Sequence, residues 1–157
     1  MATPSPSTRV GGGRGFCGLT PLCATWHTEC VPPLPVQCLI IPVTAVFGPT
    51  PPLHLVTFDQ TNEGGLANAI RETIGGWFQV VGVPHGSVCI DDEGKIKDLA
   101  ENIVATHLAH EAGLSVGDRI VGPAVAVGAV DSDGYDTSVS DALVEYLKSV
   151  GCQIEEG

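Results

Sequence analysis

The clearest potential for chemistry in this sequence lies in two histidines and a glutamate within the stretch HLAHE. His107 and His110 are three residues apart, and Glu111 lies four residues after His107. On a helix these spacings make the three side chains neighbours on one surface. Two imidazoles and a carboxylate can bind one transition-metal ion. One hypothesis for the function is therefore a metal-dependent enzyme that uses His107, His110 and Glu111.

The same stretch has a simpler interpretation, which we favour. Its order is not that of HExxH, in which the two histidines are four residues apart and enclose the glutamate. No further ligand is identifiable in the sequence. A half-exposed helix with solvated histidine and glutamate side chains accounts for the pattern equally well. On this interpretation the protein is not an enzyme, and we expect neither an identifiable catalytic residue nor a cofactor.

Two adjacent aromatic residues, Trp77 and Phe78, form a candidate binding surface. They open the run WFQVVGV, which is rich in residues that favour strands. Neighbouring side chains on a strand point to opposite faces, so one ring should face the core and the other the solvent. The outward ring could contact a partner, although single exposed aromatic residues are common on protein surfaces.

An aspartate-rich segment, DSDGYD from Asp131 to Asp136, resembles a calcium-binding loop in composition. Its glycine follows the second aspartate directly, so it departs from the spacing of an EF-hand loop. A helix is predicted to begin shortly afterwards, and acidic residues before a helix are favoured by the helix dipole. We therefore interpret the segment as the approach to a helix.

Charge is distributed unevenly along the chain. The whole chain has a net charge of −11, whereas residues 39–157 hold five basic and 17 acidic residues, a net charge of −12. Such a region is repelled by phosphate backbones and by anionic membrane surfaces. We therefore expect no direct nucleic-acid binding and no membrane association. A basic host protein is the kind of partner that this charge favours.

The six cysteines favour a reducing environment. Four of them, Cys17, Cys23, Cys30 and Cys38, are separated by five, six and seven residues, without the short pair usual in zinc sites. Free thiols are the preferred interpretation, and a loose metal site with His27 is the alternative. No apolar run is long enough to span a membrane, and glycine and proline interrupt the stretch 16–24, which argues against a signal peptide. We expect a cytoplasmic protein of undetermined oligomeric state.

The composition predicts one domain behind an irregular segment. Residues 1–37 are rich in proline, glycine and cysteine and show neither strand nor helix periodicity, so we expect a flexible extension. Residues 38–152 should form a single α+β domain, and residues 153–157 a C-terminal tail. The domain should contain a small mixed or antiparallel sheet with about three helices.

The expected elements follow from periodicity and from turn residues. Strands are predicted over residues 39–47, 53–58, 77–83, 87–90 and 119–127, with brief pairing over 95–99. Helices are predicted from a cap at Asn62 to residue 74, from a cap at Asn102 to Gly113, and from a cap at Ser138 through residues 139–150. The inward face of the second helix is either Val104, His107, Leu108 and Glu111 or Ile103, Thr106 and His110.

The last helix is the clearest element. Its apolar stripe consists of Val139, Ala142, Leu143, Tyr146, Leu147 and Val150. An isolated helix of this length is marginal in water. We therefore expect the stripe to pack on the strands over 77–83 and 119–127, with Leu143 largely buried.

An ordered series of motifs resembles a known family. GGWFQVVGVP, CIDDEGKIKDLAEN, ATHLAH and DRIVGPAVAVG follow one another, and LIIPV matches the usual opening. Over about residues 39–130 the chain resembles the family catalogued as domain of unknown function 3846. The resemblance implies a small protein of a bacteriophage or an actinobacterial mobile element, and it carries no catalytic residues. The favoured function is thus a non-enzymatic binding or accessory protein that acts inside a host cell.

Overall fold

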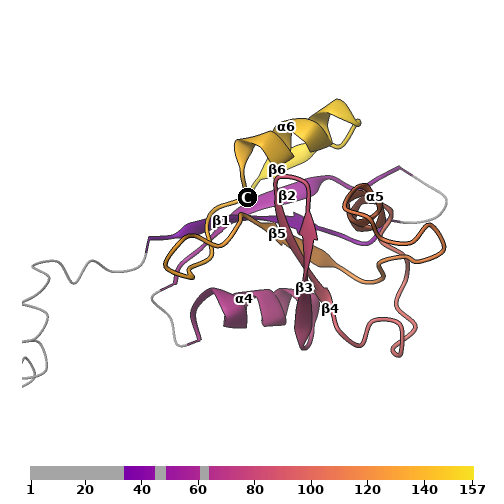
Figure 1. The fold of residues 1–157 in the computed structure, drawn as a ribbon, viewed down its shortest axis with the longest axis horizontal. Helices are drawn as coiled ribbons and strands as arrows, with labels where there is room; N and C mark the ends of the chain where they lie inside the picture. The colour runs from indigo at the N-terminus through magenta and orange to yellow at the C-terminus, as the bar shows by residue number, and fades with distance from the viewer. Residues whose placement is uncertain (1–33, 45–48, 61–63) are drawn as a thin grey trace, which may run out of the picture. The chain divides into compact units, whose positions relative to one another are not determined.

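A computed structural model describes residues 34–44, 49–60 and 64–157. The chain divides into two units, Met1–Pro33 and Leu34–Gly157, and only the second is described. In this unit a six-stranded sheet has one helix on one face and two helices on the other (Figure 1). The elements are β1 (Val36–Ile41), β2 (Leu53–Phe58), α4 (Gly65–Ile74), β3 (Phe78–Val83), β4 (Gly86–Asp91), α5 (Ile103–Glu111), β5 (Ala124–Val127), α6 (Asp141–Ser149) and β6 (Ile154–Glu156).

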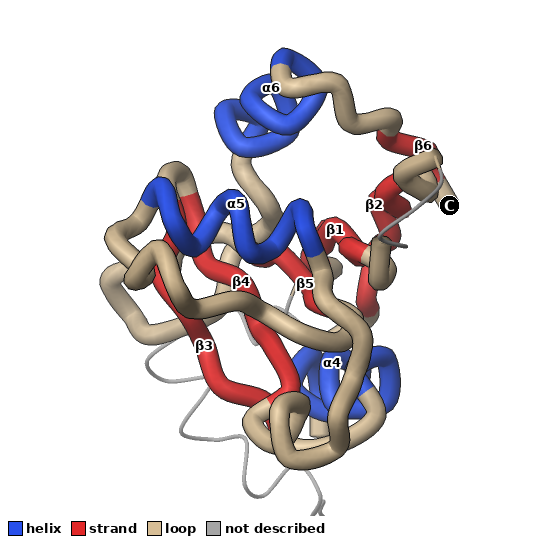
Figure 2. The backbone as a smooth tube through the Cα atoms, turned by 90° about the vertical axis from the view of Figure 1, so that its right-hand side faces the viewer, coloured by secondary structure: helices blue, strands red, loops and turns tan. Residues whose placement is uncertain are grey.

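The strand order is β3-β4-β5-β1-β2-β6, so β5 lies between the hairpins β3–β4 and β1–β2. All neighbours are antiparallel except β6, which pairs in parallel with β2. Figure 2 shows β3 and β6 at opposite ends of this sheet. The mixed sheet and the three helices confirm the predicted α+β class.

The central strands are buried on both faces, and strand alternation explains the two cores. In β1, Val36 and Cys38 pack with α4, whereas Leu39 and Ile41 belong to the larger core under α5 and α6. In β5 the valines face α4 and the alanines face the other two helices. Successive side chains of a strand point to opposite faces, so one strand supplies both cores.

The helix α4 agrees with its predicted apolar face. Leu66, Ile70 and Ile74 are buried, and Gly75 ends the helix with φ of +93°, a left-handed conformation that glycine adopts readily. The predicted cap at Asn62 lies outside the described residues. Gly64 occupies the N-cap position.

The helix α5 begins at its predicted cap but buries a different face. Asn102 accepts a hydrogen bond from the backbone N–H of Ala105 (3.1 Å) and donates to the carbonyls of Ile41 and Gly122 (3.0 Å each). Neither predicted face is correct, because the buried residues combine members of both. They are Val104, Ala105, Thr106, Leu108 and Ala109.

The helix α6 begins at Ser140, whose side chain caps the backbone N–H of Leu143, rather than at the predicted Ser138. Leu143 is fully buried and belongs to the same core as Val83, Ala124 and Ala126, as expected. The buried stripe is narrower than predicted. Its members are Val139, Leu143 and Leu147, with Val144 and Tyr146 partly buried, whereas Ala142 and Val150 are exposed.

Several strand limits differ from the predictions. The first strand is β1 at Val36–Ile41, and it stops before Pro42, which has no N–H for the ladder. Residues 45–47 of the predicted strand lie outside the described residues. The run 119–127 forms a strand only at β5, after Gly122 with φ of +83° and Pro123. Residues 95–99 lie in turns and the segment after them, and form no strand.

The two ends of the described unit also differ from the expected limits. β1 begins ahead of residue 38, and residues 154–156, expected in a tail, form β6 on the sheet. Leu53 pairs with Ile154 and Leu55 with Glu156, which explains the added strand. In the described part of the chain, no helix has the length and apolar character needed to cross a membrane.

Candidate functional site

The most distinctive surface of the described unit is the open edge of the sheet at β3. In the described residues β3 pairs only with β4, through the tight turn at Pro84 and His85. Asp92 donates its backbone N–H to the carbonyl of Trp77 (3.0 Å). In an antiparallel pair, alternate residues bond to the partner strand. The backbone N–H and C=O groups of Phe78, Val80 and Gly82 therefore point away from β4, to the open side.

This edge carries no charge. The sequence of β3 is FQVVGV, and Val80 is 59% exposed. Apart from Gly82 and its two chain neighbours, no described residue has an atom within 4 Å of the position that a Cβ of Gly82 would occupy. Natural edge strands usually carry lysine, proline or an inward-pointing charge that prevents pairing with another chain. β3 lacks each of these features.

The two predicted binding residues lie at the beginning of this edge. Trp77 is 66% exposed, and the guanidinium carbon of Arg71 lies 3.9 Å from the centre of its ring. Phe78 is partly buried and packs against the α4 core. Alternation along the strand thus places one ring outward and one inward, whereas their role in binding stays a prediction.

A small hollow lies beside β3 on the α4 face of the sheet. It encloses about 100 Å³, and its lining includes Phe78, Val80, Val130 and Asp136. Val130 is 56% exposed, and Asp136 is exposed. The hollow thus has apolar walls and one carboxylate, next to the open strand.

A second hollow, of about 150 Å³, lies on the α5 face of the same strand and is lined in part by Gln79 and Val81. Two of the three aspartates in its lining are paired, whereas Asp92 is in no ion pair of the described residues. Lys97 bonds to the buried Asp91 (2.9 Å), which raises the pKa of that lysine. Lys95 bonds to Asp118, and this bond holds the pKa of the carboxyl group below its ordinary value.

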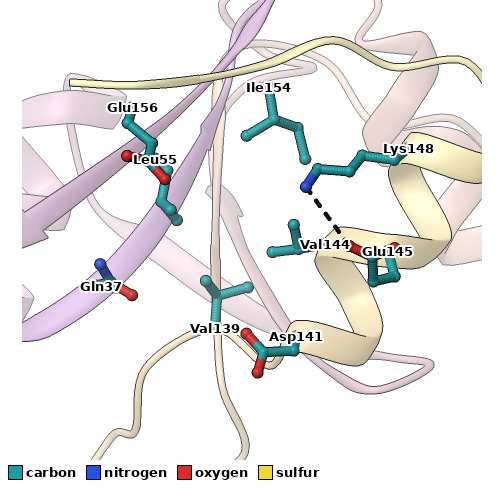
Figure 3. A pocket seen from close by; sticks show the side chains of 9 residues that line it. All are labelled: Gln37, Leu55, Val139, Asp141, Val144, Glu145, Lys148, Ile154 and Glu156. Carbon is teal, nitrogen blue, oxygen red and sulfur yellow. Dashed lines mark hydrogen bonds and ion pairs between the residues drawn. The ribbon is translucent and has the colours of Figure 1, made fainter.

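A third, larger hollow of about 300 Å³ lies at the other end of the sheet, between α6 and the strands β1, β2 and β6 (Figure 3). Its lining combines the apolar residues Leu55, Val139, Val144 and Ile154 with polar and charged side chains. Lys148 reaches toward Glu145, with 3.5 Å between Nζ and Oε1. We find no buried, unpaired polar group aimed into it among the residues described.

The predicted metal ligands have separate partners. His107 Nε2 bonds to the hydroxyl of Tyr146 (2.9 Å), and the two rings are stacked in parallel. His110 Nε2 bonds to the carbonyl oxygen of Asp118 (2.7 Å), and Glu111 is exposed. Within residues 34–44, 49–60 and 64–157, no three His, Cys, Asp or Glu side chains form a group suited to a metal ion. The structure therefore does not bring His107, His110 and Glu111 together as a ligand set.

The aspartate-rich loop satisfies its own backbone. Asp131 Oδ1 accepts the backbone N–H groups of Asp133 and Tyr135 (2.9 Å each). This geometry is that of an Asx turn, which aspartate adopts without a ligand. The loop leads to α6, consistent with the interpretation from the sequence.

The thiols of the sheet are unsuited to nucleophilic chemistry. Cys38 and Cys89 are buried on the α4 face, and burial raises the pKa of each thiol from 9.0 to about 12. The thiolate is the reactive form, so these thiols are inert at neutral pH. Burial also raises the pKa of Cys152.

Fold and site together define a small α+β protein whose most distinctive surface, among the described residues, is an uncharged, unpaired strand edge. The chain belongs to the family described as Domain of unknown function (DUF3846), which matches residues 45–155. The match confirms the resemblance seen in the sequence, and a phage or actinobacterial source stays a prediction. No curated protein matches the chain. No solved structure matches it either.

Sequence reasoning identified Trp77 and Phe78 but missed Val80, Asp136 and the open edge itself. The signal that could have found the edge is the uncharged run FQVVGV leading into a tight turn at Pro84-His85-Gly86. Which strand lies at an edge, however, depends on the pairing of strands far apart in the chain. The proximity of Asp136 to Val80 depends on the same pairing.

Proposed function

We propose that this protein is a non-enzymatic binding protein that adds an extended segment of a basic partner protein to its β3 edge. The observation that carries the proposal is the open, uncharged strand at the end of a sheet that is otherwise well packed. In strand addition, backbone hydrogen bonds supply affinity and hollows for alternate side chains supply specificity.

The β3 edge has both requirements. Phe78, Val80 and Gly82 direct their backbone N–H and C=O groups outward, as the register with β4 dictates. The side chains of an added strand would alternate between the two faces of the sheet. One hollow adjoins β3 on each face, so successive side chains of the segment would meet different surroundings.

Charge supports a basic partner. Residues 39–157 hold a net charge of −12, which attracts cationic proteins and accelerates their association. A second copy of this chain would bring an equally acidic surface to the same edge. Repulsion between like charges therefore disfavours a symmetric β3–β3 dimer, although the uncharged strand alone would permit it.

The proposal is testable with a synthetic peptide in which lysine and valine alternate, and with a matched peptide in which glutamate replaces lysine. Hydrogen exchange of the isotope-labelled protein, followed by NMR, reports on each backbone N–H. We expect the lysine peptide to slow exchange at Val80 and Gly82, whose backbone N–H groups bond to no other strand among the residues that the structure describes. The glutamate peptide should leave these rates unchanged.

A pair of matched variants locates the contact. Val80→Lys places a charge on the edge, whereas Val150→Lys makes the same change at an exposed valine at the end of α6. Only Val80→Lys should abolish protection of the edge by the lysine peptide. Unchanged exchange at Val80 and Gly82 with every peptide would overturn the proposal. Protection that rises with protein concentration alone, with a dimer in sedimentation equilibrium, would replace the basic partner by a second copy.

A further inference from the structure

We propose that the hollow on the α4 side of β3 receives a lysine or arginine side chain of the added segment, with the aliphatic stem on Val80 and Val130 and the charged end at Asp136. This inference rests on the proposed function, because it requires a strand beside β3. It specifies the type of side chain at one position of the added segment. Strand addition alone, which uses the backbone, does not specify that side chain.

The walls of the hollow fit an aliphatic stem. Val80 and Val130 are 59% and 56% exposed, and the partly buried ring of Phe78 lies between the strand and the α4 core. Long cationic side chains bury their methylene groups along apolar surface while their charged ends stay in water. An exposed valine pair next to an open strand is a surface that such a stem would cover.

The carboxylate of Asp136 fits the charged end. It lines the same hollow, and no ion pair of the described residues includes it. The negative charge of Asp136 also acts on buried groups on this face of the sheet. Burial is the main cause of the high pKa of Cys38 and Cys89, and the charge of Asp136 adds to it. A cation at Asp136 would neutralise a negative charge in a hollow that no described lysine or arginine lines.

Strand geometry brings the side chain to this hollow. Phe78 and Val80 line it, so even-numbered residues of β3 face the α4 side. A residue of the added strand directly opposite Val80 projects to the same side, about 5 Å from β3. Gly82, next along this face, contributes no side chain, and the space where its Cβ would stand is open. A long side chain can therefore turn from the added strand over Val80 toward Asp136.

The opposite face has different chemistry. The hollow there already contains two basic side chains, since Lys95 is paired with Asp118, and Arg119 lies 3.9 Å from Glu101. A cation from the partner would meet these basic residues, whereas no described basic residue lines the hollow on the α4 face. The two faces together therefore favour a segment in which cationic residues facing α4 alternate with uncharged residues facing α5.

The test compares Asp136→Asn with Asp133→Asn, which removes the same charge from the same loop but from a residue outside the hollow. Binding of the lysine–valine peptide is followed by the fluorescence of Trp77 in a Trp26→Phe background, since the chain has two tryptophans. We expect Asp136→Asn to weaken binding about fivefold, the upper range for an exposed ion pair. Asp133→Asn should change the affinity less than twofold, an effect of long-range charge of about 0.4 kcal/mol or less.

A second peptide separates this inference from the proposed function. In it norleucine replaces the one lysine that faces Val80, which keeps the stem and removes the charge. Its affinity should be insensitive to Asp136→Asn. Equal losses for Asp133→Asn and Asp136→Asn, or no loss for either, would overturn the inference. If the lysine–valine peptide still protected the Val80 and Gly82 amides in that case, the proposed strand addition would remain supported. If that peptide failed to protect these amides in the unaltered protein, both the strand addition and the cation site would be overturned.

Discussion

The two edges of the sheet differ in length, charge and neighbours. β6 has three residues, two of them Glu155 and Glu156, and Glu155 lies 3.9 Å from the ring of His54 on β2. β3 has six residues and no charge, and its Val80 is largely exposed. Shortness and charge are the usual means by which a sheet avoids pairing with other chains. In the described part of the chain, one edge is thus protected and the other is open, which is the distribution expected from the proposed strand addition at β3.

The neighbours of the two edges differ as well. Beside β6, the lining of the third hollow, under α6, includes acidic side chains and one lysine. Beside β3, the hollow on the α5 face is lined by both acidic and basic side chains, whereas the hollow on the α4 face is lined by one carboxylate and no basic residue. Three predictions test this comparison in solution.

The largest effect should come from Leu143→Ala, which removes the centre of the contact that holds α6 above the sheet. Leu143 is fully buried, and truncation of a buried leucine costs about 2–5 kcal/mol. Chemical denaturation gives the free energy of unfolding. Val150→Ala, at an exposed position, should change it by less than about 0.5 kcal/mol. Because α6 leads the chain to β6, exchange at the β6 edge should rise. Leu143 also lies beside Gly86 and in one core with Val83, so exchange in the β3–β4 hairpin should rise with it. Unchanged exchange at both edges would contradict the role of Leu143 in holding α6 on the sheet.

The second effect concerns the middle of the sheet. The folded pKa of Cys38 and of Cys89 is about 12, above the ordinary 9.0. A group whose pKa is raised on folding stabilises the folded state below its unfolded pKa, and this stability is lost as the pH rises. The free energy of unfolding should therefore fall as the pH rises from about 9 to about 12. In the double variant Cys38→Ala/Cys89→Ala, the free energy of unfolding should depend less steeply on pH, whatever its value at neutral pH. An unchanged slope would show that these thiols do not titrate in the unfolded chain as expected.

The smallest effect on stability, but a clear one on association, should follow from Glu155→Val/Glu156→Val. This double variant turns β6 into an uncharged edge, although a short one. Loss of the exposed pair with His54 should cost less than about 1 kcal/mol. Sedimentation velocity should reveal concentration-dependent self-association. The control Glu72→Val/Glu111→Val changes the same charges on α4 and α5. Equal association of both variants would assign the effect to net charge rather than to the edge.

Local sequence signals predicted much of the fold and little of the site. The apolar periodicity of Leu66, Ile70 and Ile74 and the cap at Asn102 are local, and the structure contains both. The face of α5 was not predictable, because this helix buries Ala105 and Ala109 against strands that approach from both hairpins. β6 was missed because three residues with two glutamates have no strand signature.

The candidate site depends on pairing between strands that are far apart in the chain, which no local sequence pattern indicates. Trp77 and Phe78 could be identified from the sequence as aromatic neighbours. Val80 belongs to the candidate site only because β3 lies at the end of the strand order, which the sequence does not indicate. Asp136 was read as one of several acids before a helix. Only the pairing of β4 with β5 brings its loop beside Val80.

The position of β5 has a consequence for the order of folding during synthesis. The hairpins β1–β2 and β3–β4 precede Ala124–Val127 in the chain, yet they join into one sheet only through this strand. While the ribosome is still adding these residues, β1 and β4 each present an unpaired inner edge. The nascent chain at that stage has two unpaired strand edges, at β1 and β4, that are paired in the finished sheet. When the four residues of β5, AVAV, pair with β1 and β4, both inner edges are covered. The small alanines of β5 leave space on their face of the sheet, which α5 and α6 then fill.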